Sequence, residues 1–399
     1  MKKAIVSILL LITLFLGYPL SGLSTFAPGT TVKSSLLMEA SSGKIIYENN
    51  SHESLPPASV TKIMTMLLIC EAIEDKTLTL DTVITASERA KSMGGSTIFL
   101  DANEKMKLDD LLKGIAVASA NDACVAVAEH MCGSVEAFVE KMNKRARELG
   151  MKDTNFVTCN GLDADNHHTS AYDIAIMSRE LLKHEMITRY TTIWMDSLRD
   201  GKFQLANTNK LVRFYSGANG LKTGSTSKAG CCISASAKRD GMQLIAVVLG
   251  AQNSKDRFNA AREMLDYGFS NFAVTSFGEK GTQVAEIPIV SGKNKTIMAL
   301  TKDSSSVLIE KTKKDLIKTH INVPKEISAP VKKGDIIGEM IVTLDGETLA
   351  KTNLIADKSV EKKNSADYFV KLFKELFILS KTDQSLMGSV FFTGAGDVT

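Results

Sequence analysis

The 399-residue sequence has little net charge, few aromatic residues and no cysteines in the Cys-x-x-Cys spacing of a zinc site. The formal net charge is +3, aromatic residues make up 6% of the chain, and no long basic block stands beside clustered aromatic residues. Proteins that bind nucleic acid carry basic patches, often with aromatic stacking residues. We therefore expect no nucleic-acid partner.

The cysteines are few and scattered. The chain has six, at positions 70, 124, 132, 159, 231 and 232. This distribution does not fit the disulfide framework of a small secreted domain. Cys124 and Cys132 fall in an Ala- and Val-rich helical pattern, and Cys231 and Cys232 fall in an expected strand, so we expect buried free thiols.

One short segment has residues of the kinds that bind metals. His167 and His168 stand near Asp163 and Asp165 in a polar stretch. A polar loop explains these residues without a metal. We predict no metal and no other cofactor.

The N-terminus has the pattern of a secretory signal peptide. Two lysines precede an apolar stretch at 4–20, and small residues follow around Gly22. We expect a signal peptide at 1–24 and an exported protein. An uncleaved membrane anchor is the alternative, because about 20 apolar residues span a bilayer, but Pro19 and Gly22 favour cleavage. No cysteine ends the stretch, which argues against lipoprotein attachment.

The next part of the chain, 30–272, has strand patterns at both ends and helical patterns between them. This order predicts a mixed α/β (α+β) domain in which the first and last strands meet in one sheet around an inserted helical subregion. The strand patterns cover 34–39, 44–48, 231–237 and 242–250, and the helical patterns cover 63–69, 108–118, 123–131, 135–149, 171–184 and 254–269.

After Phe272 the pattern becomes all-β. Short Val- and Ile-rich runs are separated by Gly, Asn, Asp and Pro, which predicts a small β-sandwich domain at 280–357. These runs lie at 284–290, 296–300, 306–310, 318–323 and 336–344.

The segment 362–381 has apolar residues at helical spacing, among them Tyr368, Phe369, Leu372 and Phe373. Lysines precede it, and charged residues lie on its other face. This pattern predicts an amphipathic helix at a membrane surface. A helix docked on the β domain is the alternative.

Three short motifs carry the chemistry. The first is Ser-x-x-Lys, which occurs four times, beginning at Ser41, Ser59, Ser225 and Ser359. Only the motif at Ser59 precedes a long apolar run able to form a buried helix. Ser119-x-Asn121 and Lys222-Thr223-Gly224 each occur once and follow in the order found in penicillin-binding proteins and class A β-lactamases.

The first motif supplies a nucleophile and a base. Ser59 and Lys62 are three residues apart on a helix and therefore share a face. A free lysine has a pKa of ~10.4, so a base role requires burial or a nearby cation to favour the neutral amine. The apolar helix supplies burial, and Lys222 is a candidate for the cation. A helix N-cap serine with an exposed lysine is the ordinary alternative.

The other two motifs supply proton relay and substrate contacts. A loop between two helical patterns carries Ser119, whose hydroxyl can relay a proton, and Asn121, whose amide suits a substrate amide. Helix capping by Asn121 is compatible with this role.

Lys222 and Thr223 can hold a carboxylate on a strand that borders the cleft. Gly224 permits close approach of a ligand to the backbone. The backbone N–H groups of Ser59 and Ser225 are the candidate oxyanion donors.

With their neighbours, these motifs resemble the low-molecular-mass penicillin-binding proteins, the serine-type D-alanyl-D-alanine carboxypeptidases of peptidase family S11. The resemblance covers nearly the whole mature chain. It rests on Pro-Ala-Ser-Val-Thr-Lys-Ile-Met at 57–64, Ser-Ala-Asn-Asp-Ala at 119–123 and Gly-Leu-Lys-Thr-Gly-Ser-Thr at 220–226, together with Met-Gly-Gly-Ser at 93–96 and Asn-Gly-Leu at 160–162.

The resemblance implies a serine β-lactamase/transpeptidase-like catalytic domain followed by a β-sandwich and an amphipathic helix. It implies an acyl-enzyme on Ser59, release of the terminal D-alanine from peptidoglycan stem peptides ending in D-Ala-D-Ala, and covalent inhibition by β-lactams. Arg257 would bind the terminal carboxylate of the peptide. Ser225 occupies a position that varies in the family. The implied location is the outer face of the cytoplasmic membrane or the cell-wall space.

Two other functions compete with this one. A class A β-lactamase shares the motif order, but such enzymes carry a Glu-x-x-Leu-Asn pattern before the third motif, and this sequence has none. The extra β domain and terminal helix also have no place in a compact β-lactamase. The second alternative is a catalytically silent wall-binding protein on the same scaffold, against which the intact Ser59, Lys62, Ser119, Asn121 and Lys222 argue.

Overall fold

The computed structural model describes residues 26–370, 372 and 373. The expected signal peptide at 1–24 lies outside these residues. Contacts divide the chain into two compact units, Met1–Phe272 and Ala273–Thr399.

The first unit is built on a five-stranded antiparallel sheet with the strand order β2-β1-β9-β8-β7. The first strand pairs with a late one, from Ser34 opposite Leu249 to Glu39 opposite Leu244. This pairing confirms the prediction that the first and last strands meet. The strands are β1 (Ser34–Glu39), β2 (Ile45–Asn49), β7 (Ala218–Thr226), β8 (Gly230–Arg239) and β9 (Met242–Ala251).

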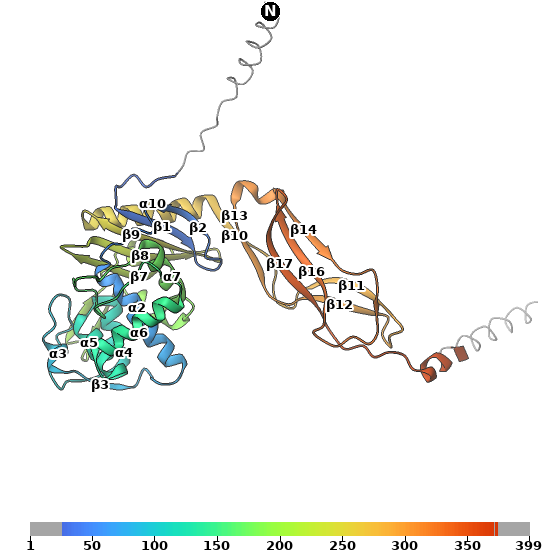
Figure 1. The fold of residues 1–399 in the computed structure, drawn as a ribbon, viewed down its shortest axis with the longest axis horizontal. Helices are drawn as coiled ribbons and strands as arrows, with labels where there is room; N and C mark the ends of the chain where they lie inside the picture. The colour runs from blue at the N-terminus through green and yellow to red at the C-terminus, as the bar shows by residue number, and fades with distance from the viewer. Residues whose placement is uncertain (1–25, 371, 374–399) are drawn as a thin grey trace, which may run out of the picture. The chain divides into compact units, whose positions relative to one another are not determined.

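Helices cover both faces of this sheet (Figure 1). One face packs against α10 (Ser254–Asn271), which buries Phe258, Ala261 and Leu265. The other face packs against α7 (Ala171–Leu181), which in turn contacts α2 (Lys62–Glu74). The predicted helices at 254–269 and 171–184 are thus confirmed, with slightly different ends.

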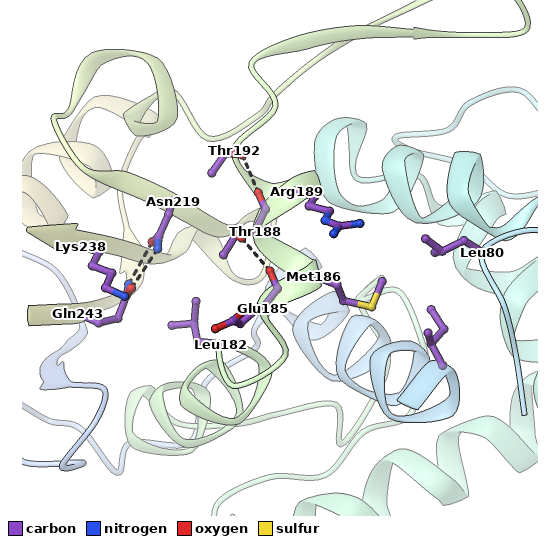
Figure 2. A pocket seen from close by; sticks show the side chains of 11 residues that line it. Leu80, Leu182, Glu185, Met186, Thr188, Arg189, Thr192, Asn219, Lys238 and Gln243 are labelled. Atoms are coloured by element: carbon purple, nitrogen blue, oxygen red, sulfur yellow. Dashed lines mark hydrogen bonds between the residues drawn. The ribbon is translucent and has the colours of Figure 1, made fainter. Parts of the chain in front are cut away.

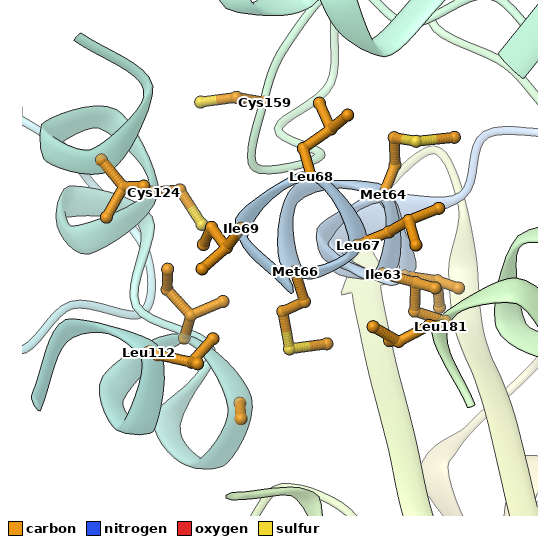
Figure 3. Packing of buried hydrophobic residues seen from close by; sticks show 14 of the residues in the cluster. Ile63, Met64, Met66, Leu67, Leu68, Ile69, Leu112, Cys124, Cys159 and Leu181 are labelled. Atoms are coloured by element: carbon orange, nitrogen blue, oxygen red, sulfur yellow. The ribbon is translucent and has the colours of Figure 1, made fainter. Parts of the chain in front are cut away.

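The helix α2 lies in the centre of the unit. Figure 3 shows its apolar side chains pointing in all directions, toward Leu112, Cys124, Cys159 and Leu181 from other elements. A helix that is apolar on every side must be surrounded by protein. Burial of this helix places Lys62 in the interior and leaves Ser59 half-buried beside it, because the 3-10 turn η1 (Ala58–Thr61) leads directly into the helix.

The remaining elements form the helical subregion and two short antiparallel strand pairs that the sequence patterns did not reveal. One pair joins β3 with β4 across an inserted segment, and the other is the hairpin of β5 and β6. The elements are β3 (Val83–Thr85), α3 (Glu88–Lys91), β4 (Lys105–Lys107), α4 (Leu108–Lys113), a π-helical turn η2 (Gly114–Ala118), α5 (Asn121–Cys132), α6 (Val135–Glu148), η3 (Glu185–Ile187), α8 (Thr188–Thr191), β5 (Met195–Leu198), β6 (Phe203–Ala206) and α9 (Leu211–Phe214).

The second unit is all-β, as predicted. A six-stranded sheet has the order β14-β16-β17-β12-β11-β15, and β10 pairs with β13 in a separate sheet. Its core includes Ile287, Ile297 and Leu354. The elements are β10 (Phe272–Gly278), β11 (Gln283–Val290), β12 (Thr296–Thr301), β13 (Ser305–Glu310), η4 (Lys311–Leu316), β14 (Ile317–Asn322), β15 (Ile327–Ser328), β16 (Ile336–Leu344) and β17 (Glu347–Ala356).

The predicted amphipathic helix at 362–381 lies only partly within the described residues. Residues 365–370 are helical, and the side chains of Tyr368, Phe369, Leu372 and Phe373 are exposed. Within the part of the chain that the structure describes, no helix combines the length and apolar character needed to cross a membrane.

Candidate active site

The first motif forms a serine–lysine pair in which Lys62 is buried and Ser59 is half-buried. The Nζ atom of Lys62 lies 2.9 Å from Oγ of Ser59, as the three-residue spacing predicted. Lys62 is completely buried. Its amine also donates to the side-chain oxygen of Asn121 at 2.7 Å and to the carbonyl of Asn160 at 2.6 Å. The three oxygens around Nζ fix the amine against the nucleophile.

Burial lowers the pKa of Lys62 below its usual value, because the charged ammonium loses its hydration. Anionic Cys124, Cys159 and Asp122 would raise it. Burial, however, raises the pKa of Cys124 to about 11 and raises that of Cys159 further, so both thiols are neutral at pH 7. Desolvation therefore dominates, and it favours the neutral amine that can accept a proton.

The side chain of Asn121 is occupied by protein contacts. Its oxygen accepts from Lys62, its Nδ2 donates to the carbonyl of Gly94 at 2.7 Å, and its backbone N–H donates to Ser96 at 2.7 Å. Asn121 thus positions Lys62 in this structure, and its predicted grip on a substrate amide stays a prediction. The adjacent Asp122 is buried and accepts backbone N–H groups.

Ser119 lies between η2 and α5, where a loop was expected. Its backbone is left-handed, with φ at 66°, and its side chain is almost completely buried. Within residues 26–370, its hydroxyl makes no hydrogen bond to another protein group. The hydroxyl is therefore uncommitted in this part of the chain, and proton relay by Ser119 stays a prediction.

The third motif lies on β7, the edge strand of the sheet, and η1 packs against this strand. Lys222 is buried, and its Nζ donates to the carbonyl of Thr223 at 3.0 Å. Burial holds the pKa of Lys222 well below its usual value, and the charges of Lys62 and Arg257 lower it further. The Thr223 hydroxyl donates to Oγ1 of Thr208 at 2.8 Å. Carboxylate binding by Lys222 and Thr223 stays a prediction.

Gly224 is the point of closest approach between strand and nucleophile. A Cβ atom there would lie 2.7 Å from the backbone nitrogen of Ser59 and 3.0 Å from the carbonyl oxygen of Pro57. The glycine thus brings the strand close to the N–H of Ser59. Ser225 follows with an exposed side chain whose Oγ lies 3.6 Å from Sγ of Cys231. Edge strands present unpaired backbone groups, which fits the expected oxyanion donors.

Arg257 contacts the motif strand from the opposite side. It is 8% exposed, and its guanidinium donates to the carbonyls of Gly224 at 3.0 Å and Cys232 at 3.4 Å. Its Nε has no partner within the described residues. The contacts seen here brace the strand, and the carboxylate contact implied by the family resemblance stays a prediction.

Several residues around the site went unrecognised in the sequence. Asn160 acts through a backbone carbonyl, which no side-chain pattern reveals, although the Asn-Gly-Leu segment was noted. His167 lies in the polar loop that the sequence predicted, but its side chain is 5% exposed and therefore buried. Its ring contacts Thr61, two residues after the nucleophile, with Nε2 2.9 Å from Oγ1.

The remaining candidate ligands do not assemble into a metal site. Among the described residues, no group of three or more His, Cys, Asp or Glu side chains is arranged to hold a metal. All six cysteines are free; Cys132 and Cys231 are half-buried and the others are buried.

A cavity of about 780 Å³ lies away from the nucleophile. Figure 2 shows Asn219 and Gln243 paired through their amides on one side and Leu80 and Met186 on the other. Neither Ser59 nor another residue of the three motifs lines it.

Comparisons with known proteins agree with this geometry. The family model of D-alanyl-D-alanine carboxypeptidases, peptidase S11, matches residues 23–253. The model of the C-terminal domain of penicillin-binding protein 5 matches residues 272–362.

Similar proteins align over most of the chain. The D-alanyl-D-alanine carboxypeptidase DacF of Bacillus subtilis is 45% identical over 335 residues, 83% of this chain and 86% of its own. The structure of penicillin-binding protein 5 from Haemophilus influenzae superimposes with a TM-score of 0.73 at 32% identity, over 85% of this chain and all of its own. Penicillin-binding protein D2 of Listeria monocytogenes, solved with ampicillin bound, superimposes with a TM-score of 0.55 at 28% identity. The match covers 60% of this chain and 97% of the Listeria chain. The chain therefore belongs to the peptidase S11 family of serine D-alanyl-D-alanine carboxypeptidases.

Proposed function

We propose that the enzyme removes the terminal D-alanine from peptidoglycan stem peptides, with Ser59 as the nucleophile and Lys62 as the general base. The observation that carries this assignment is the 2.9 Å contact between Nζ of the buried Lys62 and Oγ of the half-buried Ser59. A base within hydrogen-bond reach of a hydroxyl, with its pKa lowered by burial, is the arrangement that activates a serine.

Acylation starts when the neutral amine of Lys62 takes the proton of Ser59 and the alkoxide attacks the carbonyl carbon of the penultimate D-alanine. The backbone N–H groups of Ser59 and Ser225 stabilise the resulting oxyanion. The C–N bond then breaks, and the leaving amine receives a proton through Lys62 or the uncommitted hydroxyl of Ser119. Water hydrolyses the Ser59 ester by the same route in reverse.

Cations on one side of the site bind the substrate carboxylate. Lys222 and Thr223 are suited to this role because they lie on the strand next to the nucleophile. Arg257 adds positive charge behind Gly224, where its guanidinium contacts the strand. A carboxylate at this place would also raise the lowered pKa of Lys222 and leave it charged in the complex.

β-Lactams acylate the same serine and hydrolyse slowly. The ampicillin-bound Listeria relative is consistent with this proposal. A β-lactamase function finds less support, because the sequence lacks the Glu-x-x-Leu-Asn pattern. The buried Ser59–Lys62 contact argues against a silent wall-binding protein.

The enzyme works outside the cytoplasm, at the outer face of the cytoplasmic membrane or in the cell-wall space. The lysine-led apolar segment at 1–24 supports export. The exposed Tyr368, Phe369, Leu372 and Phe373 support attachment of the C-terminal helix to a lipid surface. Sedimentation with anionic lipid vesicles tests attachment: Phe369→Glu should reduce binding, and equal binding by both proteins would refute it.

The function is tested by D-alanine release. The purified protein should release D-alanine from a diacyl-Lys-D-Ala-D-Ala peptide and turn over penicillin only slowly. Rapid penicillin hydrolysis without D-alanine release would favour a β-lactamase, and absence of both reactions would favour a wall-binding protein.

A further inference from the structure

The peptide bond between Ala58 and Ser59 has an unusual backbone setting. Ala58 is buried and has a φ of 49°, in the left-handed region that residues other than glycine rarely adopt. The carbonyl of Ala58 and the N–H of Ser59 belong to this one planar unit and point in opposite directions. Whatever holds the carbonyl therefore also aims the N–H.

A side chain holds that carbonyl. Oγ1 of Thr61 donates a hydrogen bond to the oxygen of Ala58 at 2.8 Å. Nε2 of His167 lies 2.9 Å from the same Oγ1. All three residues are buried, Thr61 completely, so these hydrogen bonds do not compete with bulk water.

The other ring nitrogen of His167 fixes the direction of this chain. Nδ1 lies 2.8 Å from the backbone nitrogen of Val157 and 3.3 Å from that of Thr158, and both N–H groups donate to it. A nitrogen that accepts carries no proton, so the proton of neutral His167 is on Nε2. Nε2–H donates to Thr61, and Thr61 donates to Ala58. Such chains polarise each member in the same sense.

The opposite side of the carbonyl is closed by backbone. A Cβ atom on Gly161 would lie 1.9 Å from the oxygen of Ala58. Gly161 belongs to the same loop as His167, and the preceding residue, Asn160, supplies the carbonyl that accepts from Lys62. One loop thus contacts both the base and the peptide unit of the nucleophile.

We propose that His167 is a positioning residue for the hydrolase reaction: through Thr61 it holds the carbonyl of Ala58 and so aims the N–H of Ser59 at the oxyanion. This inference rests on the proposed role of Ser59. It assigns His167 no contact with substrate, since the side chain acts only through Thr61.

The surroundings keep His167 neutral at the pH of the reaction. Burial lowers the pKa of His167 to about 4, the charge of His168 lowers it as well, and Asp163 raises it. The Phe156 ring, 6.0 Å away, adds no charge. Protonation places a hydrogen on Nδ1 against the N–H groups of Val157 and Thr158, which breaks the chain. The contribution of His167 is therefore complete well above pH 4 and is lost as the pH falls through about 4.

The test separates binding of a fluorescent penicillin from the first-order acylation step by stopped-flow. His167→Ala and Thr61→Val should each slow acylation roughly 10- to 100-fold, a part of the loss seen when an oxyanion donor is removed, with the initial dissociation constant within about twofold. Both residues act through one chain of hydrogen bonds, so their effects should not multiply. The acylation rate constant of the double variant should lie within about threefold of that of the slower single variant.

Matched variants complete the design. His167→Gln carries both an acceptor and a donor and should stay within about threefold of the wild type. Its rate relative to the wild type should rise below pH 4, because glutamine does not titrate. His168→Ala, in the same loop, should acylate as the wild type does.

The proposal would be overturned if His167→Ala were acylated as fast as His168→Ala. It would also be overturned if the reduction in acylation rate of the double variant equalled the product of the two single reductions. If His167→Ala does not fold, Thr61→Val decides: folding with wild-type acylation overturns it. Ser59→Ala in the same assay distinguishes the two proposals, because persistent acylation there would refute the role of Ser59 itself.

Discussion

The amine of Lys62 lies 2.9 Å from the hydroxyl of Ser59 while also donating to the side chain of Asn121 at 2.7 Å. One nitrogen therefore links the nucleophile of the first motif to the asparagine of the second. The contact depends on burial, because an exposed lysine would be protonated and would hydrogen-bond to water.

Lys62→Met should nearly abolish acylation while preserving the buried volume. The loss of a positioned general base costs roughly 10²- to 10⁴-fold, which a fluorescent-penicillin rate assay measures. The control is Lys44→Met in the Ser-x-x-Lys motif that begins at Ser41. The hydroxyl of Ser41 donates to the carboxylate of Glu39 and not to the lysine. Similar rates for the two variants would contradict the base role of Lys62.

Asn121→Asp should move the pH dependence of acylation upward. A carboxylate 2.7 Å from Lys62 favours the ammonium form. The pKa of Lys62 therefore rises and the fraction of neutral amine at pH 7 falls. Rates measured from pH 6 to 10 should approach the wild-type rate only at alkaline pH. An unchanged pH midpoint would show that another group controls the acylation rate.

Gly224→Ala should slow acylation by about tenfold or more and cost about 1–3 kcal/mol of stability. The added Cβ would lie 2.7 Å from the nitrogen of Ser59 and 2.9 Å from Cβ of Ala58, neither of which belongs to a flexible side chain. The backbone φ of Gly224 is not left-handed, so the effect is steric. Gly29→Ala, with space for a methyl group, is the control. Wild-type rates in Gly224→Ala would exclude close packing at this point.

Lys222→Met should raise the free energy of unfolding at pH 7 while removing activity, since an apolar group replaces a lysine whose charged form is disfavoured by burial. Because the native pKa of Lys222 lies below its unfolded value, the unfolded chain binds the proton more tightly. The destabilisation of the folded state by Lys222 is greatest below its native pKa, decreases as the pH rises above that value, and is gone above about 10.5.

Urea unfolding at pH 7 and pH 10 measures this difference. The advantage of Lys222→Met over the wild type should shrink at pH 10. Lys255→Met, at an exposed lysine, should show no advantage at either pH. An advantage of Lys222→Met that grows with pH would contradict the account.

The sequence pattern predicted the central helix and the sheet because their residues leave little choice. Residues 63–69 are apolar except for Thr65, so the helix was expected to be buried on all sides, which the structure confirms. By contrast, β17 was missed, because inward positions such as Thr352 and Ala356 are polar or small. The alternation of apolar and polar residues along β17 is therefore too weak to predict a strand.

The motifs predicted the contact between Ser59 and Lys62 and the strand beside them, but not how the protein holds these groups. The left-handed backbone of Ala58 and the carbonyl of Asn160 are main-chain features that depend on tertiary contacts. The side chain of Asn121 suits several roles, and only the structure shows that it holds Lys62. Likewise, the burial of His167 comes from folding of a segment that is polar in sequence.

The most direct test identifies the acylated serine. Mass spectrometry of the penicillin-treated protein should find one adduct, on the peptide that contains Ser59, and the same protein should release D-alanine from diacyl-Lys-D-Ala-D-Ala. Ser59→Ala should lose both the adduct and the release, whereas Ser41→Ala in the decoy motif should keep both. An adduct on another serine, or D-alanine release that survives Ser59→Ala, would contradict the assignment of Ser59 as the nucleophile.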